Sequence, residues 1–343
     1  MASKEALNIN KTNGIALISA IRCDRSEGNP QKGLERLAEW PTFSLPPDLI
    51  HEMAECYDAM GETTKAYHSF REANRRSSFD NLDVDRTLVT RYIEKMLVQH
   101  QAPEDEPFHP APALHEPSPM FIVGFTCNGG DELGKMLNHH PSFGALGDLP
   151  AMDAARKALE GKDLGPLSQL SNDDIQRARE AYFSVSGRRV PSGHRVIDTS
   201  PLNVLSLPLV YRIFPDSCTI RMVRHPVETV FQAFRKLQRV NAISCHLDSM
   251  SRCAQLFLAT NAMGNHYRDS LGIPMFDVAY EEFKGAPQKY GEGIVQSFGE
   301  TWSPVPGFEP STPLDQWHRY RSDLAPWTGE LKKLATEMGY PAK

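Results

Sequence analysis

The sequence lacks several features that would each point to a particular class of protein. Its six cysteines are scattered and form no C-x-x-C pair, which argues against a metal knuckle and against a dense disulfide framework. It contains no run of about 18 apolar residues, and its start has no basic stretch leading into an apolar one. These absences predict a cytoplasmic protein that does not span a membrane and holds no metal ion.

An excess of positive charge is also absent. The net charge of the 343 residues is −6, so the sequence predicts neither a nucleic acid nor an anionic membrane surface as a partner. Hydrophobic residues make up 40% and charged residues 23% of the chain, which is an ordinary composition for a folded domain. The length allows one large domain and a smaller one.

The first part of the chain carries helical periodicity. Residues 48–60 and 64–74 each have an amphipathic pattern, and Gly61 separates them, which predicts a helical hairpin. Residues 14–41 are compatible with a neighbouring helical unit and residues 88–99 with a capping helix. The small and aromatic positions of the hairpin have the spacing of a tetratricopeptide repeat: Ala54, Tyr57, Ala66, Phe70 and Ala73. We therefore expect a helical, tetratricopeptide-like segment over residues 1–101, with a possible protein partner on its surface.

A proline-rich stretch follows over residues 102–119. Six prolines stand among acidic and small residues there, a composition that cannot continue a helix. We place the domain boundary in this stretch, either as a free linker or as an extended segment packed on the surface.

Beyond the linker the periodicity changes to that of alternating strands and helices. An apolar run over 120–124 ends in glycine and leads through a glycine-rich turn to a helical pattern over 132–138. Further strands are predicted over 195–198, 218–223 and 274–278, and helices over 201–213, 226–237 and 250–271. This alternation predicts a P-loop-like α/β domain over residues 120–343, with a parallel sheet flanked by helices.

Five segments carry a family resemblance: Gly124 to Asp131, Asp198 to Asn203, Leu209 to Asp216, Arg221 to Thr229 and Tyr280 to Phe283. In this order and spacing the chain resembles the bacterial sulfotransferases that carry tetratricopeptide repeats, relatives of the tyrosylprotein sulfotransferases. The resemblance covers roughly residues 45–340. It implies transfer of a sulfuryl group from 3′-phosphoadenosine 5′-phosphosulfate (PAPS) to a hydroxyl group of a small-molecule or peptide acceptor.

The loop that would hold the phosphosulfate departs from the family pattern, G-x-P-R-S-G-T-T. Gly124 and Gly129 match, but Cys127 replaces the arginine, Asn128 the serine, and Gly130 and Asp131 the two threonines. The lysine of the family's Asp-Lys-x-Pro motif is replaced by Thr199, and the basic segment before the C-terminal helix is shortened. The resemblance therefore implies a degenerate site, in which Gly124, Asn128, Gly129 and Gly130 remain as loop residues near the donor.

The nucleotide end of the donor site is partly kept. Arg224 matches the arginine that binds the 3′-phosphate, Gln232 stands in place of the serine eight residues later, and Tyr280 matches a tyrosine near the adenine. The resemblance thus implies a cleft for PAPS or adenosine 3′,5′-bisphosphate. Asp148 takes the position of the family's general base, although an Asp before Leu-Pro also suits a cap or turn. Cys127 is either a nucleophile near a helix N-terminus or a partly buried small side chain.

Three hypotheses follow from these residues. The chain is a sulfotransferase-like protein whose use of PAPS is weakened, lost or altered; or it is a pseudoenzyme that acts as a binding or scaffold module; or its altered loop serves a different reaction in the same cleft. All three share one fold and differ in what the cleft binds.

Overall fold

A computed structural model describes residues 13–38, 40, 45–79, 84–85, 87–99, 111–237 and 244–341. The chain forms two compact units: the first contains Met1–Val89, Pro226–Leu256 and Asp315–Lys343, and the second contains Thr90–His225 and Phe257–Leu314. Residues 102–110 of the predicted linker lie outside the described residues. The predicted domain boundaries stay a prediction.

In the described part of the second unit, five strands form one sheet in the order β2-β3-β1-β4-β5. The strands are β1 (Met120–Gly124), β2 (Phe143–Ala145), β3 (Arg195–Asp198), β4 (Cys218–Val223) and β5 (Phe276–Ala279). All four strand pairs are parallel, so the five carboxyl ends lie at one edge of the sheet. In open parallel sheets, ligands bind at that edge, where the order of strands reverses direction.

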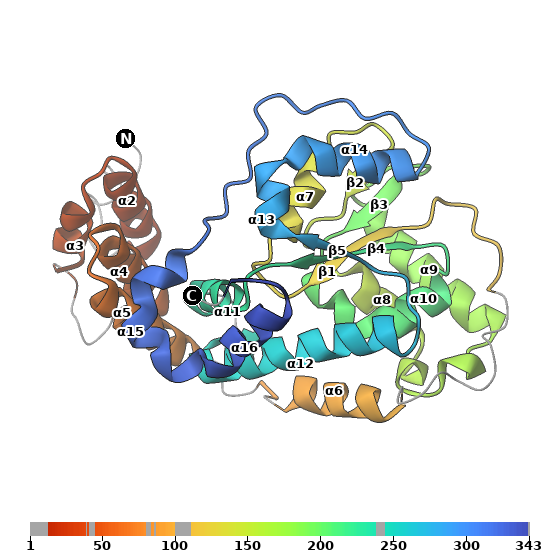
Figure 1. Cartoon of the computed structure of the whole chain (residues 1–343), viewed down its shortest axis with the longest axis horizontal. Helices are drawn as coiled ribbons and strands as arrows, with labels where there is room; N and C mark the ends of the chain where they lie inside the picture. Colours follow the sequence, from red (N-terminus) through yellow and green to blue (C-terminus); the bar gives the residue numbers. More distant parts are fainter. Residues whose placement is uncertain are drawn as a thin grey trace. The chain divides into compact units, whose positions relative to one another are not determined.

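Helices cover both faces of this sheet, as Figure 1 shows: α7, α13 and α14 lie on one face, and α8, α9 and α10 on the other. Their bounds are α7 (Gly130–Leu137), α8 (Ala151–Ala158), α9 (Asn172–Ser186), α10 (Leu207–Ile213), α13 (Tyr280–Gly285) and α14 (Pro287–Ser297), with short 3-10 turns η2 (Lys162–Leu164), η3 (Leu167–Gln169) and η4 (Pro201–Ser206). Helices α6 (Leu88–Gln99) and α12 (Met250–Asp269) have residues in both units. The arrangement confirms the predicted α/β class.

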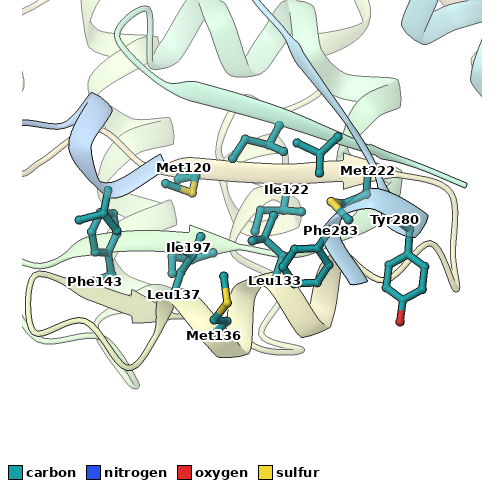
Figure 2. Packing of buried hydrophobic residues seen from close by; sticks show 13 residues of the cluster. Met120, Ile122, Leu133, Met136, Leu137, Phe143, Ile197, Met222, Tyr280 and Phe283 are labelled. Carbon is teal, nitrogen blue, oxygen red and sulfur yellow. The ribbon is translucent and has the colours of Figure 1, made fainter. Parts of the chain in front are cut away.

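The core between the sheet and α7 holds the predicted loop in place. Every residue of β1 is buried, as expected for a central parallel strand covered on both faces. Figure 2 shows Ile122 of β1 close to Leu133 and Met136 of α7, with Tyr280 at the rim of the cluster and its hydroxyl directed away from the apolar side chains. The apolar body of Tyr280 thus belongs to the core while its polar end faces the site.

The first unit is helical in its described N-terminal part, with α2 (Gly14–Ser26), α3 (Pro30–Ala38), α4 (Pro47–Ala59) and α5 (Thr63–Phe79). Gly61, with φ +78°, makes the turn between α4 and α5, a conformation that favours glycine. The side chains of Ala54, Ala66, Phe70 and Ala73 are fully buried. This confirms the helical N-terminal segment, and its assignment to the tetratricopeptide family stays a prediction.

Helix α11 (Pro226–Arg235) belongs to this first unit because its last residues are bonded to α4 and α5. Arg235 donates to Asp58 at 3.0 Å and to Glu55 at 3.1 Å, and Asn74 donates to the carbonyl oxygen of Phe234 at 2.7 Å. The unit is completed by η5 (Ser244–Leu247), η6 (Gln316–Tyr320), α15 (Arg321–Leu324), η7 (Ala325–Trp327) and α16 (Gly329–Glu337). None of the helices in the described residues is both long and apolar enough to cross a membrane.

Candidate functional site

The residues that the sequence nominates follow the carboxyl ends of the strands. The loop 125–129 leaves β1, Thr199 follows β3, Arg224 follows β4 and Tyr280 follows β5, while Asp148 comes three residues after β2. Because the strands are parallel, these positions share one edge of the sheet. The sheet topology therefore gathers side chains that are far apart in the sequence.

Left-handed backbone shapes the loop between β1 and α7. The φ angles are +140° at Gly124, +63° at Cys127 and +93° at Gly129. A Cβ atom added to Gly124 would lie 2.4 Å from the side-chain nitrogen of Asn128 and 2.6 Å from the carbonyl oxygen of Met222. Glycine is therefore required at this position both by conformation and by space.

Asn128 stabilises the loop from inside. Its side chain is buried; Nδ2 donates to the carbonyl oxygens of Val123 at 3.2 Å and Met222 at 3.1 Å, and Oδ1 accepts from the N–H of Gly130 at 3.0 Å. Both amide hydrogens are thus used by main-chain oxygens of β1 and β4. The role that the geometry gives Asn128 is to fix the turn.

Cys127 is half-buried and is one of the non-glycine residues with positive φ, which is uncommon outside strained or functional loops. Its sulfur lies 3.8 Å from the hydroxyl of Thr126, and its carbonyl oxygen accepts from Nη1 of Arg224 at 3.0 Å. The backbone of Cys127 therefore takes part in the site through its oxygen.

Arg224 and Tyr280 come together above the loop. The Arg224 guanidinium lies over the Tyr280 ring, 5.2 Å from its centre, and also donates to the carbonyl oxygen of Pro313. The Tyr280 ring rests directly on Gly129, where an added Cβ would come within 2.1 Å of it. The predicted nucleotide residues Arg224 and Tyr280 are thus neighbours, and Gly129 leaves room for the ring.

Glu132, in the first turn of α7, accepts hydrogen bonds from three residues of this arrangement, and it is not among the site residues predicted from the sequence. Its buried carboxylate accepts from the Tyr280 hydroxyl at 2.6 Å, from the N–H and hydroxyl of Ser311 at 2.9 Å and 2.8 Å, and from the N–H of Thr312 at 2.9 Å. Burial raises the pKa of Glu132, but these hydrogen bonds outweigh it and leave the pKa below its usual value. Burial, followed by the Glu132 carboxylate, raises the pKa of Tyr280.

The end of β3 carries a buried carboxyl group and a packing threonine. Asp198 accepts from the N–H of Ser200 at 3.0 Å and from the hydroxyl of Tyr182 at 3.3 Å, and burial raises its pKa to about 6. Thr199 packs against α7, because a Cβ added to Gly134 would lie 2.4 Å from the Thr199 methyl group. The position at which the family pattern has a lysine is used here for packing.

Asp148 and Gln232 lie in different surroundings. The side chain of Asp148 is 95% exposed and its carboxylate is 3.5 Å from Nη1 of Arg189. Gln232, on α11 of the first unit, donates to Glu228 at 2.7 Å and to Gln316 at 2.8 Å. Gln232 is thus part of a polar network within the first unit. No cluster of three or more potential metal ligands occurs among the residues that the structure describes.

A comparison with known protein families gives one match for this chain. Residues 119–304, more than half of the chain, match the family model described as Sulfotransferase family. The chain belongs to the sulfotransferase family. Among curated proteins, none matches it.

This sulfotransferase-family chain is also similar to solved structures. A sulfotransferase from Alicyclobacillus acidocaldarius is 20% identical, with 64% of this chain and 96% of that chain covered and a TM-score of 0.38. The sulfotransferase domain of the olefin synthase from Synechococcus PCC 7002 is 17% identical, with 69% and 99% covered and a TM-score of 0.41. A sulfotransferase from Mycobacterium avium is 14% identical, with 74% and 76% covered and a TM-score of 0.37.

Proposed function

We propose that this sulfotransferase-family protein has kept a site for the adenosine bisphosphate part of PAPS but has weakened or lost the transfer of the sulfuryl group. The family generally uses PAPS and acts on small-molecule acceptors. In this chain Arg224 and Tyr280 would hold the nucleotide, beside the loop residues Gly129 and Gly130. The observation that carries the proposal is the buried Glu132 carboxylate at the start of α7.

Charge is the first argument. Sulfuryl transfer, like phosphoryl transfer, depends on positive groups and backbone donors that neutralise charge on the transferred group and the leaving phosphate. The first turn of α7 instead carries Asp131 and Glu132. Two like charges at about 4 Å repel by about 4 kcal/mol at an effective dielectric constant near 20. That is about half of the binding free energy of a micromolar ligand.

Hydrogen bonding is the second argument. Asn128 donates both amide hydrogens to main-chain oxygens, and the Thr199 side chain packs on α7. The family's lysine, which contacts the transferring group, thus has no cationic counterpart at Thr199. The residues present do not fit a bound phosphosulfate, whereas the Arg224 and Tyr280 pair suits a nucleotide. A binding role without efficient transfer accounts for both observations.

The acceptor side is represented by Asp148. Its exposed carboxylate lies three residues past the end of β2, where the hydroxyl group of an acceptor can reach it from the solvent. Asp148 would be the general base in any residual transfer. Protein binding through the helical N-terminal segment is the second candidate function, and the exposed apolar side chain of Met60 at the α4–α5 turn is the observation that favours it.

Thermal stability in the presence of adenosine 3′,5′-bisphosphate tests the proposal. A ligand at about 100 times its Kd adds about 2.7 kcal/mol to the free energy of unfolding, which raises Tm by several degrees. Adenosine and inorganic sulfate serve as ligand controls. Arg224→Met should abolish the shift, and Arg188→Met, which removes an exposed arginine, should leave it unchanged.

Transfer is measured separately, as release of sulfate from PAPS with and without phenol and simple alcohols. The proposal expects nucleotide binding with slow or undetectable release. No thermal shift at millimolar nucleotide, in the wild type and in Glu132→Ala alike, would refute the retained nucleotide site. Rapid acceptor-dependent release that is lost in Asp148→Asn would refute the weakened transfer.

A further inference from the structure

A short segment at the surface is hydrogen-bonded to Glu132, Arg224 and Tyr280 of the site. We call residues 311–313 the strap. They lie in a stretch without helix or strand between α14 and η6, and Ser311 and Pro313 are exposed to solvent. Beneath them Arg224 and Tyr280 are 1% and 0% exposed. The strap is therefore a layer of chain between solvent and these two residues.

One side of the strap donates hydrogen bonds. The N–H and hydroxyl of Ser311 and the N–H of Thr312 all reach the same oxygen, Oε1 of Glu132, at 2.8 to 2.9 Å. Hydrogen bonds to an ionised group are roughly twice as strong as those between neutral groups. Glu132 is thus the principal anchor for the donors of the strap.

The other side of the strap accepts hydrogen bonds. The carbonyl oxygen of Thr312 accepts from Nζ of Lys284 at 2.6 Å and lies 3.1 Å from the hydroxyl of Tyr280. The carbonyl oxygen of Pro313 accepts from Arg224. The strap carbonyls therefore use the same donors that an anionic ligand would need.

We infer that the strap is an intramolecular latch, held by Glu132 and Lys284, that must leave before a ligand reaches Arg224 and Tyr280. The ligand named here, a nucleotide, rests on the proposed function, while the latch itself rests on the hydrogen bonds of the strap. If the latched form does not bind, the apparent affinity of the protein for the ligand is reduced by the fraction of molecules that are open.

The sequence around the strap suits such a device. Pro304, Pro306, Pro310 and Pro313 restrict the backbone of this stretch, so little conformational freedom is lost when the latch closes. Outside the strap the stretch is tied at Val305, whose N–H and carbonyl oxygen exchange hydrogen bonds with the Gln288 side chain at 3.1 Å and 2.9 Å. The stretch is thus anchored six residues before the strap begins.

Hydrogen exchange on the full chain tests the latch. Glu132→Ala removes the acceptor shared by Ser311 and Thr312, so exchange of the peptide covering residues 307–315 should become at least about tenfold faster. Asp131→Asn is the matched control, because it removes the same charge from the same helical turn at an exposed position. Exchange in this control should equal that of the wild type. Unchanged exchange in Glu132→Ala would overturn the latch.

Lysine variants test the second anchor. Lys284→Met should also speed exchange over residues 307–315, by a smaller factor than Glu132→Ala, whereas Lys289→Met, at an exposed position nearby, should not. Equal exchange in the two lysine variants would overturn the assignment of Lys284 as an anchor.

Calorimetric titration with adenosine 3′,5′-bisphosphate tests the gating. Glu132→Ala should bind the nucleotide at least about fivefold more tightly than Asp131→Asn. Both variants remove one acidic charge near the ligand, but only Glu132→Ala also removes the hydrogen bonds that hold the strap closed. Equal affinities would overturn the gating. If no variant binds while Glu132→Ala still speeds exchange, the latch is supported and the proposed nucleotide site is refuted.

Discussion

The contact between Gly129 and the Tyr280 ring leads to a prediction with a size set by the structure. In Gly129→Ala the new Cβ would lie 2.1 Å and 2.4 Å from two ring carbons of Tyr280, and the residue would have to keep φ near +93°. Left-handed backbone costs about 1–2 kcal/mol for an L-residue, and overpacking costs about 1–3 kcal/mol. We therefore expect a loss of about 2–5 kcal/mol in the free energy of unfolding.

Urea unfolding followed by circular dichroism measures this loss. Gly272→Ala is the matched control in the same unit, because Gly272 has φ +65° but no atom within 4 Å of a new Cβ. It should lose only the backbone part, about 1–2 kcal/mol. Combining Gly129→Ala with Tyr280→Leu should recover part of the clash in a double-mutant cycle. Equal losses in the two glycine variants would refute the argument that the ring rests on the loop.

Two further predictions concern stability. Burial raises the pKa of Asp198 to about 6, so the unfolded chain loses this proton at lower pH than the folded one. The free energy of unfolding should therefore fall by about 3 kcal/mol from this group as pH rises from about 4 to about 6. In urea unfolding, Asp198→Asn should remove this pH dependence. A pH dependence that persists in the variant would contradict the prediction. Ser171 caps α9 by accepting from the N–H of Asp174 at 3.2 Å in a capping box. Ser171→Ala should cost about 1 kcal/mol, and an unchanged unfolding midpoint would show that the cap contributes nothing.

Local sequence was enough for most of the sheet and its helices. The strands β1, β3 and β4 have the predicted bounds, because strands buried on both faces read as short apolar runs beside turn residues. Strand β5 begins at Phe276, two residues after the predicted start at Pro274. The strand β2 was not predicted, since three residues that include Gly144 are too few to form a pattern.

The family resemblance led to Gly124, Gly129, Arg224 and Tyr280, and the parallel sheet explains why they lie near one another, since they stand at or after the carboxyl ends of β1, β4 and β5. The sequence did not predict that Glu132 accepts hydrogen bonds from Ser311 and Thr312. An acidic residue in the first turn of a helix reads as a partner of the helix dipole, and the residues that bind this one, Ser311 and Thr312, are 179 and 180 positions away.

The sequence by itself places Cys127 and Thr199 where the family pattern has an arginine and a lysine, and Asn128 where that pattern has a serine. Only the tertiary structure decided what replaces them. It sets Asn128 to hold the turn, Thr199 to pack on α7, and Glu132 to bind the strap. The reason is physical. The charge of a side chain follows from the identity of one residue. A hydrogen bond between distant segments forms only when the fold brings the donor and acceptor atoms within about 3 Å of each other.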